Sequence, residues 1–218
     1  MIKAALFDLD GTLVNSLEDL ATSGNFALES FGFAIHETEK YKYFVGNGMP
    51  KLIERILPLN SDGDTKKKVL EVFMNHYRQH YIDKTKPYDE IIPLLNELKN
   101  RGIKIGVVSN KAHEMTLNVV DKIFGNVFDF VTGKVEGKPT KPDPELTLSV
   151  MEELGVKPSE CVFIGDSGMD AAVAKNADCI GIGVLWGFRK KDELLENGAH
   201  YTVKSPKEIL NIIEELNK

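Results

Sequence analysis

Apolar residues along this chain follow two different repeats. From about residue 85 onward, short runs rich in Val and Ile alternate with longer stretches in which apolar residues recur every three to four positions. The first spacing predicts buried strands and the second predicts amphipathic helices. We expect strands at 103–109, 128–132, 161–164 and 179–184, and helices at 91–100, 111–124, 146–154, 171–176 and 209–216. This alternation predicts an α/β fold with a doubly wound parallel sheet.

One further strand stands apart from this series. The apolar run Ile2 to Phe7 is followed by residues 15–84, where helical spacing prevails and strand-like runs are scarce. We expect helices after a capping residue at Asn15 or Ser16, from Pro50 and over 66–81. If the first strand joins the later sheet, residues 1–14 and 85–218 form one core, and residues 15–84 are an all-helical insertion.

Composition and charge limit the functions that this core can have. The 218 residues are 42% hydrophobic, and the net charge of -6 argues against generic nucleic-acid binding. An anionic substrate would have to be held by local cations or a metal. Cys161 and Cys179 lie in apolar segments and are interpreted as core thiols. With neither a signal-peptide pattern nor an apolar run of roughly 18 residues, we expect a cytoplasmic protein that does not enter a membrane.

Polar groups of chemical interest follow the predicted strands. They occur in four segments, which are Asp8-Leu9-Asp10-Gly11-Thr12, Ser109-Asn110, Lys141-Pro142-Asp143-Pro144 and Gly165-Asp166-Ser167-Gly168-Met169-Asp170. Because parallel strands share a carboxyl edge, these groups are expected to converge. Four of the carboxylates (Asp8, Asp10, Asp166 and Asp170), together with Lys141 and Ser109, suit a Mg²⁺ ion that holds a phosphate. As core packing they would be unpaired buried charges, which are costly.

The four segments, in this order and within this alternation of strands and helices, resemble the motifs of the haloacid dehalogenase superfamily, and specifically of its phosphatase branch. The combination of D-x-D-G-T after an N-terminal strand with G-D-S-x-x-D is specific, and the resemblance covers nearly the whole chain. It implies a Rossmann-like core with a helical cap inserted after the first motif, in agreement with the insertion at 15–84. A mobile unit rooted beside a reactive site is typical of a lid.

The resemblance also implies a role for each motif residue. Asp8 would be the nucleophile that forms an aspartyl-phosphate, and Asp10 would be the acid that protonates the leaving oxygen and then the base that activates water. Mg²⁺ would lie between Asp8, the backbone carbonyl of Asp10 and Asp166. Asp170 would reach the ion through water or orient Lys141. The expected contacts to the phosphoryl group come from Asp8, Gly11, Thr12, Ser109, the Asn110 N–H and Lys141.

Several nearby residues could add to this set. Lys138 also precedes a Pro, but Lys141 opens K-P-D-P-E before a predicted helix, which matches the family loop. Lys111 follows Ser109 at an expected helix start, and whether it contacts the site stays open. Trp186 and Phe188 follow the last expected strand and are interpreted as packing residues.

Residues of the expected cap bear on the substrate. Asp10 argues against dehalogenases, which lack the second acid, and residues 15–20 lack the histidine that related sugar-phosphate mutases carry. The segment 45–55, V-G-N-G-x-x-x-L-x-x-R, resembles that of the phosphoglycolate phosphatase group. The helix that begins near Pro50 would present a positive N-terminus, a natural site for an anion.

We therefore expect cap residues to bind the carboxylate of a substrate such as 2-phosphoglycolate. The candidates are Gly46, Asn47, Gly48, Lys51 and Arg55. The alternative is that Lys51 and Arg55 only solvate their helix. Other small phosphomonoesters, pyrophosphate, nucleotides or sugar phosphates stay open as substrates, as do a mutase of the β-phosphoglucomutase kind and a non-catalytic sensor of a phospho-metabolite. Both a monomer and a homodimer fit the sequence.

Overall fold

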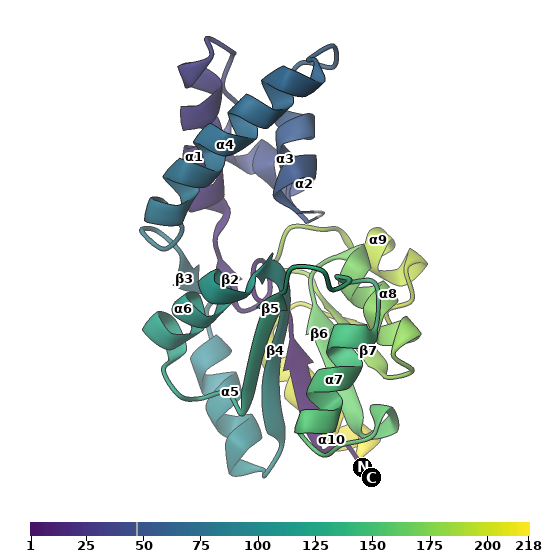
Figure 1. Ribbon diagram of the computed structural model, residues 1–218. Helices are drawn as coiled ribbons and strands as arrows, with labels where there is room; N and C mark the ends of the chain where they lie inside the picture. Colours follow the sequence, from purple (N-terminus) through teal and green to yellow (C-terminus); the bar gives the residue numbers. More distant parts are fainter. Residues whose placement is uncertain (47) are drawn as a thin grey trace. The chain divides into compact units, whose positions relative to one another are not determined.

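A computed structural model describes residues 1–46 and 48–218 (Figure 1). The chain divides into two compact units, each described here by itself. Met1–Val14 and Pro87–Lys218 form the first, here called the α/β unit, and Asn15–Lys86 form the second, here called the helical unit. Among the described residues, no helix has both the length and the apolar composition needed to cross a membrane.

The α/β unit is built on a six-stranded sheet of order β5-β4-β1-β6-β7-β8, in which the neighbouring strands run parallel. Its strands are β1 (Ala4–Phe7), β4 (Lys104–Ala112), β5 (Phe130–Lys134), β6 (Cys161–Gly165), β7 (Ile180–Val184) and β8 (Tyr201–Val203). Phe7 is in register with Val107 of β4 and Ile164 of β6, so the carboxyl ends of the three central strands lie level. The predicted α/β fold with a parallel sheet is confirmed.

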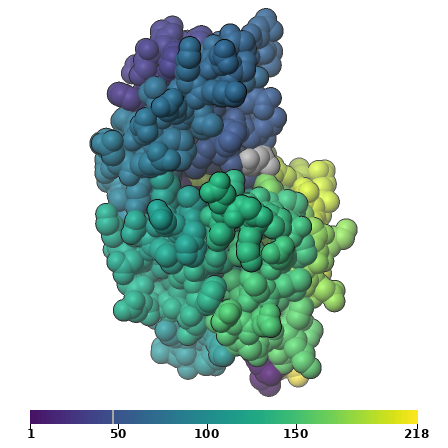
Figure 2. Space-filling model, in the orientation of Figure 1, coloured from purple at the N-terminus to yellow at the C-terminus, as the bar shows by residue number. Residues whose placement is uncertain are grey.

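Helices flank this sheet as the alternating pattern predicted. They are α5 (Ile91–Asn100), α6 (His113–Phe124), α7 (Glu145–Glu153), η2 (Pro158–Glu160), α8 (Gly168–Asn176), α9 (Lys191–Glu196) and α10 (Pro206–Leu216). Leu6 and Phe163 pack in one apolar cluster with Val150 of α7 and Val173 of α8. The four residues of β1 are fully buried, and the strand, purple in Figure 1, is covered in the space-filling view (Figure 2). The first motif therefore starts from a rigid central strand.

Strand β4 differs from the expectation at its end. A helix was expected from residue 111, but β4 continues to Ala112, with a shift in its register to β5 after Val108. Helix α6 begins only at His113, and the Thr116 hydroxyl donates to the carbonyls of Lys111 and Ala112. These contacts keep Lys111 in extended backbone at the carboxyl edge of the sheet.

The helical unit consists of α1 (Leu17–Ser30), η1 (Thr38–Lys40), α2 (Tyr41–Phe44), α3 (Met49–Ile56) and α4 (Gly63–His80). Ser16 is the N-cap residue of α1 but makes no capping hydrogen bond with its side chain, whereas the Asn15 side chain accepts a hydrogen bond from the Leu17 N–H at 3.2 Å. The Asp19 carboxylate accepts from the N–H groups of Lys84 and Thr85, which ties the end of the unit to its first helix. Two short strands, β2 (Val14–Asn15) and β3 (Lys86–Pro87), pair where the chain passes between the units.

Candidate active site

The carboxyl ends of β1 and β6 carry the two acidic motifs side by side. Asp8 follows β1 directly, and its N–H donates to the Ile164 carbonyl of β6 at 2.9 Å. Asp166 follows the last residue of β6. Ligand oxygens of Asp8, Asp166 and Asp170 all lie within 4.8 Å of one another. The structure thus brings three of the four predicted carboxylates into one cluster.

Burial sets the electrostatics of this cluster. It raises the pKa of Asp8 to about 7, although the charge of Lys141 opposes the rise. It also raises the pKa of Asp166 well above its usual range, with the charges of Asp170 and Asp8 adding to the effect. Neighbouring buried carboxylates cannot all ionise without a cation. A compact set of hard oxygen donors of this kind fits Mg²⁺.

Lys141 lies between the nucleophile candidate and Asp170. Its Nζ is 2.8 Å from Asp8 Oδ1 and 2.7 Å from Asp170 Oδ1, and its side chain is 2% exposed. Burial alone would lower the pKa of Lys141, but the charges of Asp170 and Asp8 outweigh it and raise the pKa to about 12. Lys141 is therefore a permanent buried cation. Lys138, its competitor in the sequence, is exposed and lies 3.6 Å from Glu145.

Two side chains hold Lys141 in place. The Asn110 amide donates to the Lys141 carbonyl at 3.1 Å and accepts from the Lys141 N–H at 3.0 Å. The other oxygen of Asp170 accepts from the Ser167 N–H and hydroxyl, at 3.0 and 2.6 Å, in a capping box that starts α8. The sequence predicts a role for the Asn110 backbone N–H only, and the contact between the Asn110 side chain and the Lys141 backbone is an addition from the structure.

Asp166 is held by a segment that the sequence had not assigned to the site. The Phe188 N–H donates to Asp166 Oδ2 at 2.7 Å, and the Thr12 hydroxyl donates to Oδ1 at 3.3 Å. The Trp186 indole donates to the Thr12 carbonyl at 3.0 Å. Trp186 through its indole and Phe188 through its backbone N–H therefore support the acidic cluster, while the Phe188 side chain is buried in the core as predicted.

Two glycines, Gly11 and Gly187, allow the backbone to approach Asp166 closely. A Cβ on Gly11, which has a φ of +90°, would lie 2.4 Å from Asp166 Oδ2. A Cβ on Gly187 would lie 2.3 Å from both the Asp166 Cβ and the Gly11 carbonyl oxygen. Such distances leave no room for a side chain. A glycine between two aromatic residues just after a core strand is the signal that could have identified this segment.

Asp10, the second acid of the first motif, pairs with Lys111. Lys111 Nζ lies 3.2 and 3.1 Å from the two carboxylate oxygens of Asp10. The Ser109 hydroxyl, a predicted phosphate contact, is buried and accepts from the Lys111 N–H at 3.2 Å. The structure answers the open question about Lys111, since it places this lysine beside Asp10.

The candidates in the helical unit form contacts within that unit. Helix α3 starts at Met49 after Gly48, with Pro50 in its first turn. Lys51 pairs with Glu54 at 2.7 Å on an exposed surface. Arg55 donates to the carbonyls of Phe44 and Val45 at 3.0 and 3.4 Å, directly before Gly46. Asn47 lies outside the described residues.

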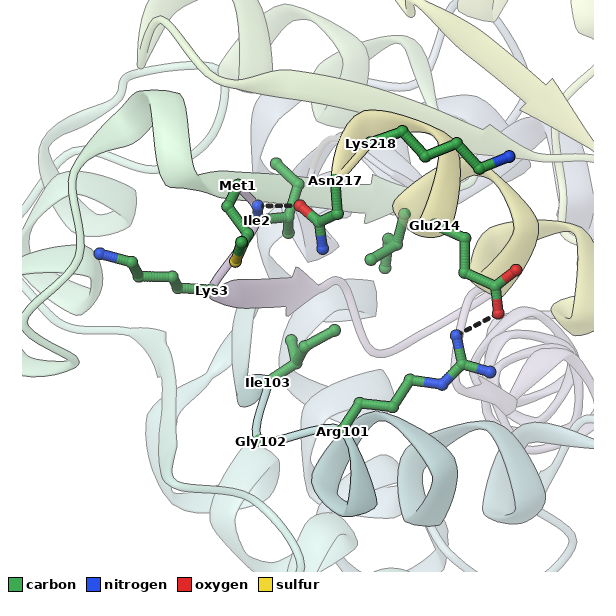
Figure 3. A pocket seen from close by; sticks show the side chains of 10 residues that line it. Met1, Ile2, Lys3, Arg101, Gly102, Ile103, Glu214, Asn217 and Lys218 are labelled. Carbon is green, nitrogen blue, oxygen red and sulfur yellow. Dashed lines mark hydrogen bonds and ion pairs between the residues drawn. The ribbon is translucent and has the colours of Figure 1, made fainter.

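A hollow of the α/β unit lies at the opposite, amino end of the central strands (Figure 3). Its lining includes Met1 to Lys3 ahead of β1 and Gly102 ahead of β4. The Arg101–Glu214 ion pair and the hydrogen bond from the Ile2 N–H to the Asn217 side chain cross it. None of the predicted site residues lines this hollow.

Known proteins resemble this chain over nearly its full length. Residues 5–184 match the model of the haloacid dehalogenase-like hydrolases. Proteins from Aquifex aeolicus and Chromobacterium violaceum, both named phosphoglycolate phosphatase, are 29% and 30% identical, and each alignment covers 98% of this chain and 97% of the relative. A solved structure from Lactobacillus delbrueckii subsp. bulgaricus, provisionally described as a phosphoglycolate phosphatase, is 33% identical with a TM-score of 0.92; the match covers 97% of this chain and 98% of that one.

Proposed function

Because this chain belongs to the haloacid dehalogenase-like hydrolases and is a phosphatase of that superfamily, we propose that it hydrolyses a small phosphomonoester through an aspartyl-phosphate on Asp8, with Mg²⁺ bound beside it. The observation that carries this proposal is the position of Lys141. The buried ammonium of Lys141 contacts the carboxylate of Asp8, which follows the central strand β1. The same ammonium also contacts the buried carboxylate of Asp170. This arrangement suits an anionic nucleophile that must approach an anionic phosphate.

The first half of the reaction transfers the phosphoryl group to Asp8. A carboxylate oxygen of Asp8 attacks phosphorus, and the bond from phosphorus to the leaving oxygen breaks. Asp10 gives its proton to that oxygen, so the alcohol leaves neutral and Asp10 becomes a carboxylate. Lys141 stabilises the negative charge shared by the nucleophile and the phosphoryl oxygens. The Ser109 hydroxyl and the Asn110 N–H donate to those oxygens.

The second half returns the enzyme to its starting state. Asp10, now a base, takes a proton from water as the water oxygen attacks phosphorus. The bond between phosphorus and the Asp8 oxygen breaks, and inorganic phosphate leaves. Asp8, Asp166 and the Asp10 carbonyl would hold Mg²⁺, with Asp170 behind Lys141. When bound, the ion supplies positive charge that offsets the repulsion between carboxylate and phosphate.

For the substrate we propose 2-phosphoglycolate. The names of the Aquifex and Chromobacterium relatives and the sequence of segment 45–55 support this choice. Arg55 is the candidate for selecting the substrate carboxylate. Its contacts with the Phe44 and Val45 carbonyls support a part in holding the backbone that precedes Gly46.

A panel of phosphorylated metabolites at fixed Mg²⁺ tests the function. We expect a higher kcat/KM for 2-phosphoglycolate than for pyrophosphate, nucleoside monophosphates or hexose phosphates. Arg55→Ala should reduce this preference, whereas the control Lys67→Ala, at an exposed residue of α4 in the same unit, should retain it. An unchanged preference in Arg55→Ala would remove the assignment of Arg55. Absence of any Mg²⁺-dependent turnover, including that of p-nitrophenyl phosphate, would favour a non-catalytic sensor instead.

A further inference from the structure

Lys111 is a buried cation that the mechanism above does not use. Its side chain is 1% exposed, and its Nζ contacts both oxygens of Asp10, whose side chain is 17% exposed. Taking an ammonium out of water is costly unless a partner compensates for the loss. Here the partner is Asp10, the acid/base carboxylate of the proposed reaction.

The backbone of Lys111 is fixed on three sides. Its N–H donates to the Ser109 hydroxyl, and its carbonyl accepts from the Thr116 hydroxyl, both at 3.2 Å. On strand β5, a Cβ at Gly133 would lie 2.5 Å from that carbonyl and 2.4 Å from the Thr116 hydroxyl. Lys111 therefore extends from a rigid strand end, and its ammonium has a defined place at the carboxyl edge.

The two buried lysines divide the acidic site between them. Lys141 contacts Asp8 and Asp170, whereas Lys111 contacts Asp10. We propose that Lys111 is a positioning residue for Asp10: it holds the Asp10 carboxylate where it can exchange a proton with the leaving oxygen. This inference rests on the proposed function, because it assigns a residue to the proton transfer of that reaction.

A positioning role predicts that the effect of losing Lys111 depends on the leaving group of the substrate. If Lys111 acts through Asp10, its loss matters only when the leaving group needs a proton. An alkoxide is a poor leaving group and needs that proton, whereas p-nitrophenolate leaves readily without it. The parameter to compare is kcat/KM, because it includes phosphoryl transfer to Asp8 and excludes the later hydrolysis that all substrates share.

The test compares Lys111→Met with Lys111→Arg, and uses Lys138→Met as the control at an exposed lysine. With two alkyl substrates, 2-phosphoglycolate and glycerol 2-phosphate, Lys111→Met should lower kcat/KM about 10- to 100-fold, the loss typical of a misplaced catalytic group. With p-nitrophenyl phosphate the loss should stay below about threefold. Lys111→Arg should recover part of the loss, and Lys138→Met should match the wild type.

A double-mutant cycle with Asp10→Asn decides whether Lys111 acts through Asp10. We expect Lys111→Met to cause little further loss with 2-phosphoglycolate in the Asp10→Asn background. An equal loss in both backgrounds would overturn the inference. A loss confined to 2-phosphoglycolate, absent with glycerol 2-phosphate, would also overturn it, because it would mean that Lys111 binds the substrate carboxylate.

These outcomes are distinct from failure of the proposed function. If the wild type hydrolyses phosphomonoesters and Asp8→Asn does not, the function stands whatever Lys111 does. If the wild type and Asp8→Asn are equally inactive, the function itself fails. Thermal unfolding of each variant checks the fold, and an equal kcat/KM loss on alkyl and aryl substrates would identify a merely structural role for Lys111.

Discussion

The two edges of the central sheet carry the same kinds of charged residue in opposite settings. At the amino edge, Lys3 lies 2.6 Å from Glu160 with 57% of its side chain exposed, and Arg101 lies 2.7 Å from Glu97. At the carboxyl edge, Lys141 lies 2.8 Å from Asp8 and is 2% exposed. The ion-pair distances are similar, and the difference between the edges is the access of water.

This difference indicates which ion pairs serve a function. Exposed pairs contribute about 0–1 kcal/mol to stability, and water screens them from any substrate. For a buried pair, the lost hydration can exceed the attraction between the charges, so a contribution to stability is weak evidence for why the pair is there. Perturbed carboxylates gathered at the end of parallel strands are therefore best explained by chemistry.

Asp8→Asn should have the largest effect on activity. Removing a nucleophile lowers kcat by roughly 10⁴-fold or more in well-studied hydrolases. Steady-state assays with p-nitrophenyl phosphate, with and without Mg²⁺, measure this loss. The metal-free variant should remain about as stable as the wild type above pH 7, because burial disfavours the ionised Asp8 carboxylate more than Lys141 favours it. Turnover near the wild-type rate would contradict the assigned nucleophile.

Lys141→Met should cost less, about 10²- to 10³-fold in kcat, as expected for one preorganised charge in a site of this kind. The substitution leaves Asp8 and Asp170 without the ammonium between them. Steady-state kinetics with saturating Mg²⁺ provides the measurement. Loss of activity in Lys138→Met but not in Lys141→Met would contradict the assignment of Lys141 to the site.

Gly187→Ala should weaken the response to Mg²⁺ while leaving the catalytic side chains unchanged. Its Cβ would collide with Asp166, so the carboxylate must move. Changes behind a metal ligand typically weaken metal affinity about 10- to 100-fold. Activity measured against Mg²⁺ concentration should show this shift, whereas Gly63→Ala, where a Cβ meets open space, should not. Equal Mg²⁺ curves for both variants would contradict a metal at Asp166.

The stabilisation by Mg²⁺ should depend on pH. Folded Asp8 keeps its proton up to a pKa of about 7, whereas an unfolded aspartate loses it near about 4. In the metal-free protein, the folded state binds more protons across this range, so stability falls as the pH rises through it. Mg²⁺ needs the ionised form, and its thermal shift should therefore be larger at pH 8 than at pH 5.5. A shift independent of pH would contradict burial of the acidic cluster.

The smallest effect is expected at the amino edge. Arg101→Met removes exposed contacts with Glu97 and Glu214 and should leave kcat, KM and the Mg²⁺ response unchanged. Thermal unfolding should change little, because water already screens these charges. A large loss of activity in this variant would mean that exposed ion pairs at the amino edge also support the reaction.

Strong periodic segments made much of this molecule predictable from its sequence. Helix α5 has the predicted bounds, because its apolar spacing is regular and Gly102 ends it with a φ of +73°. Helix α9 (Lys191–Glu196) and strand β8 (Tyr201–Val203) were not predicted, because each is short and mostly polar or mixed in sequence. Such elements form through contacts with neighbours that no local pattern records.

The site shows the same limit. Asp8, Lys141, Asp166 and Asp170 could be predicted because their motifs are local in sequence, and the structure brings them together. The place of Lys111 depended on whether β4 or α6 includes residue 111, a boundary that local propensity does not determine. The contacts of residues 186–188 with Asp166 and Thr12 join segments more than 20 positions apart, so the sequence could only suggest packing there.

Trapping with borohydride tests whether Asp8 carries the phosphoryl group during turnover. Borohydride reduces an acyl phosphate to an alcohol, so an aspartyl-phosphate at position 8 would be converted to homoserine. We predict that peptide mass spectrometry, after quenching during turnover of 2-phosphoglycolate or p-nitrophenyl phosphate with Mg²⁺, finds homoserine in place of Asp8. The product should be absent without substrate. Homoserine at another aspartate, or steady turnover that leaves Asp8 unmodified in every quench, would contradict an aspartyl-phosphate on Asp8.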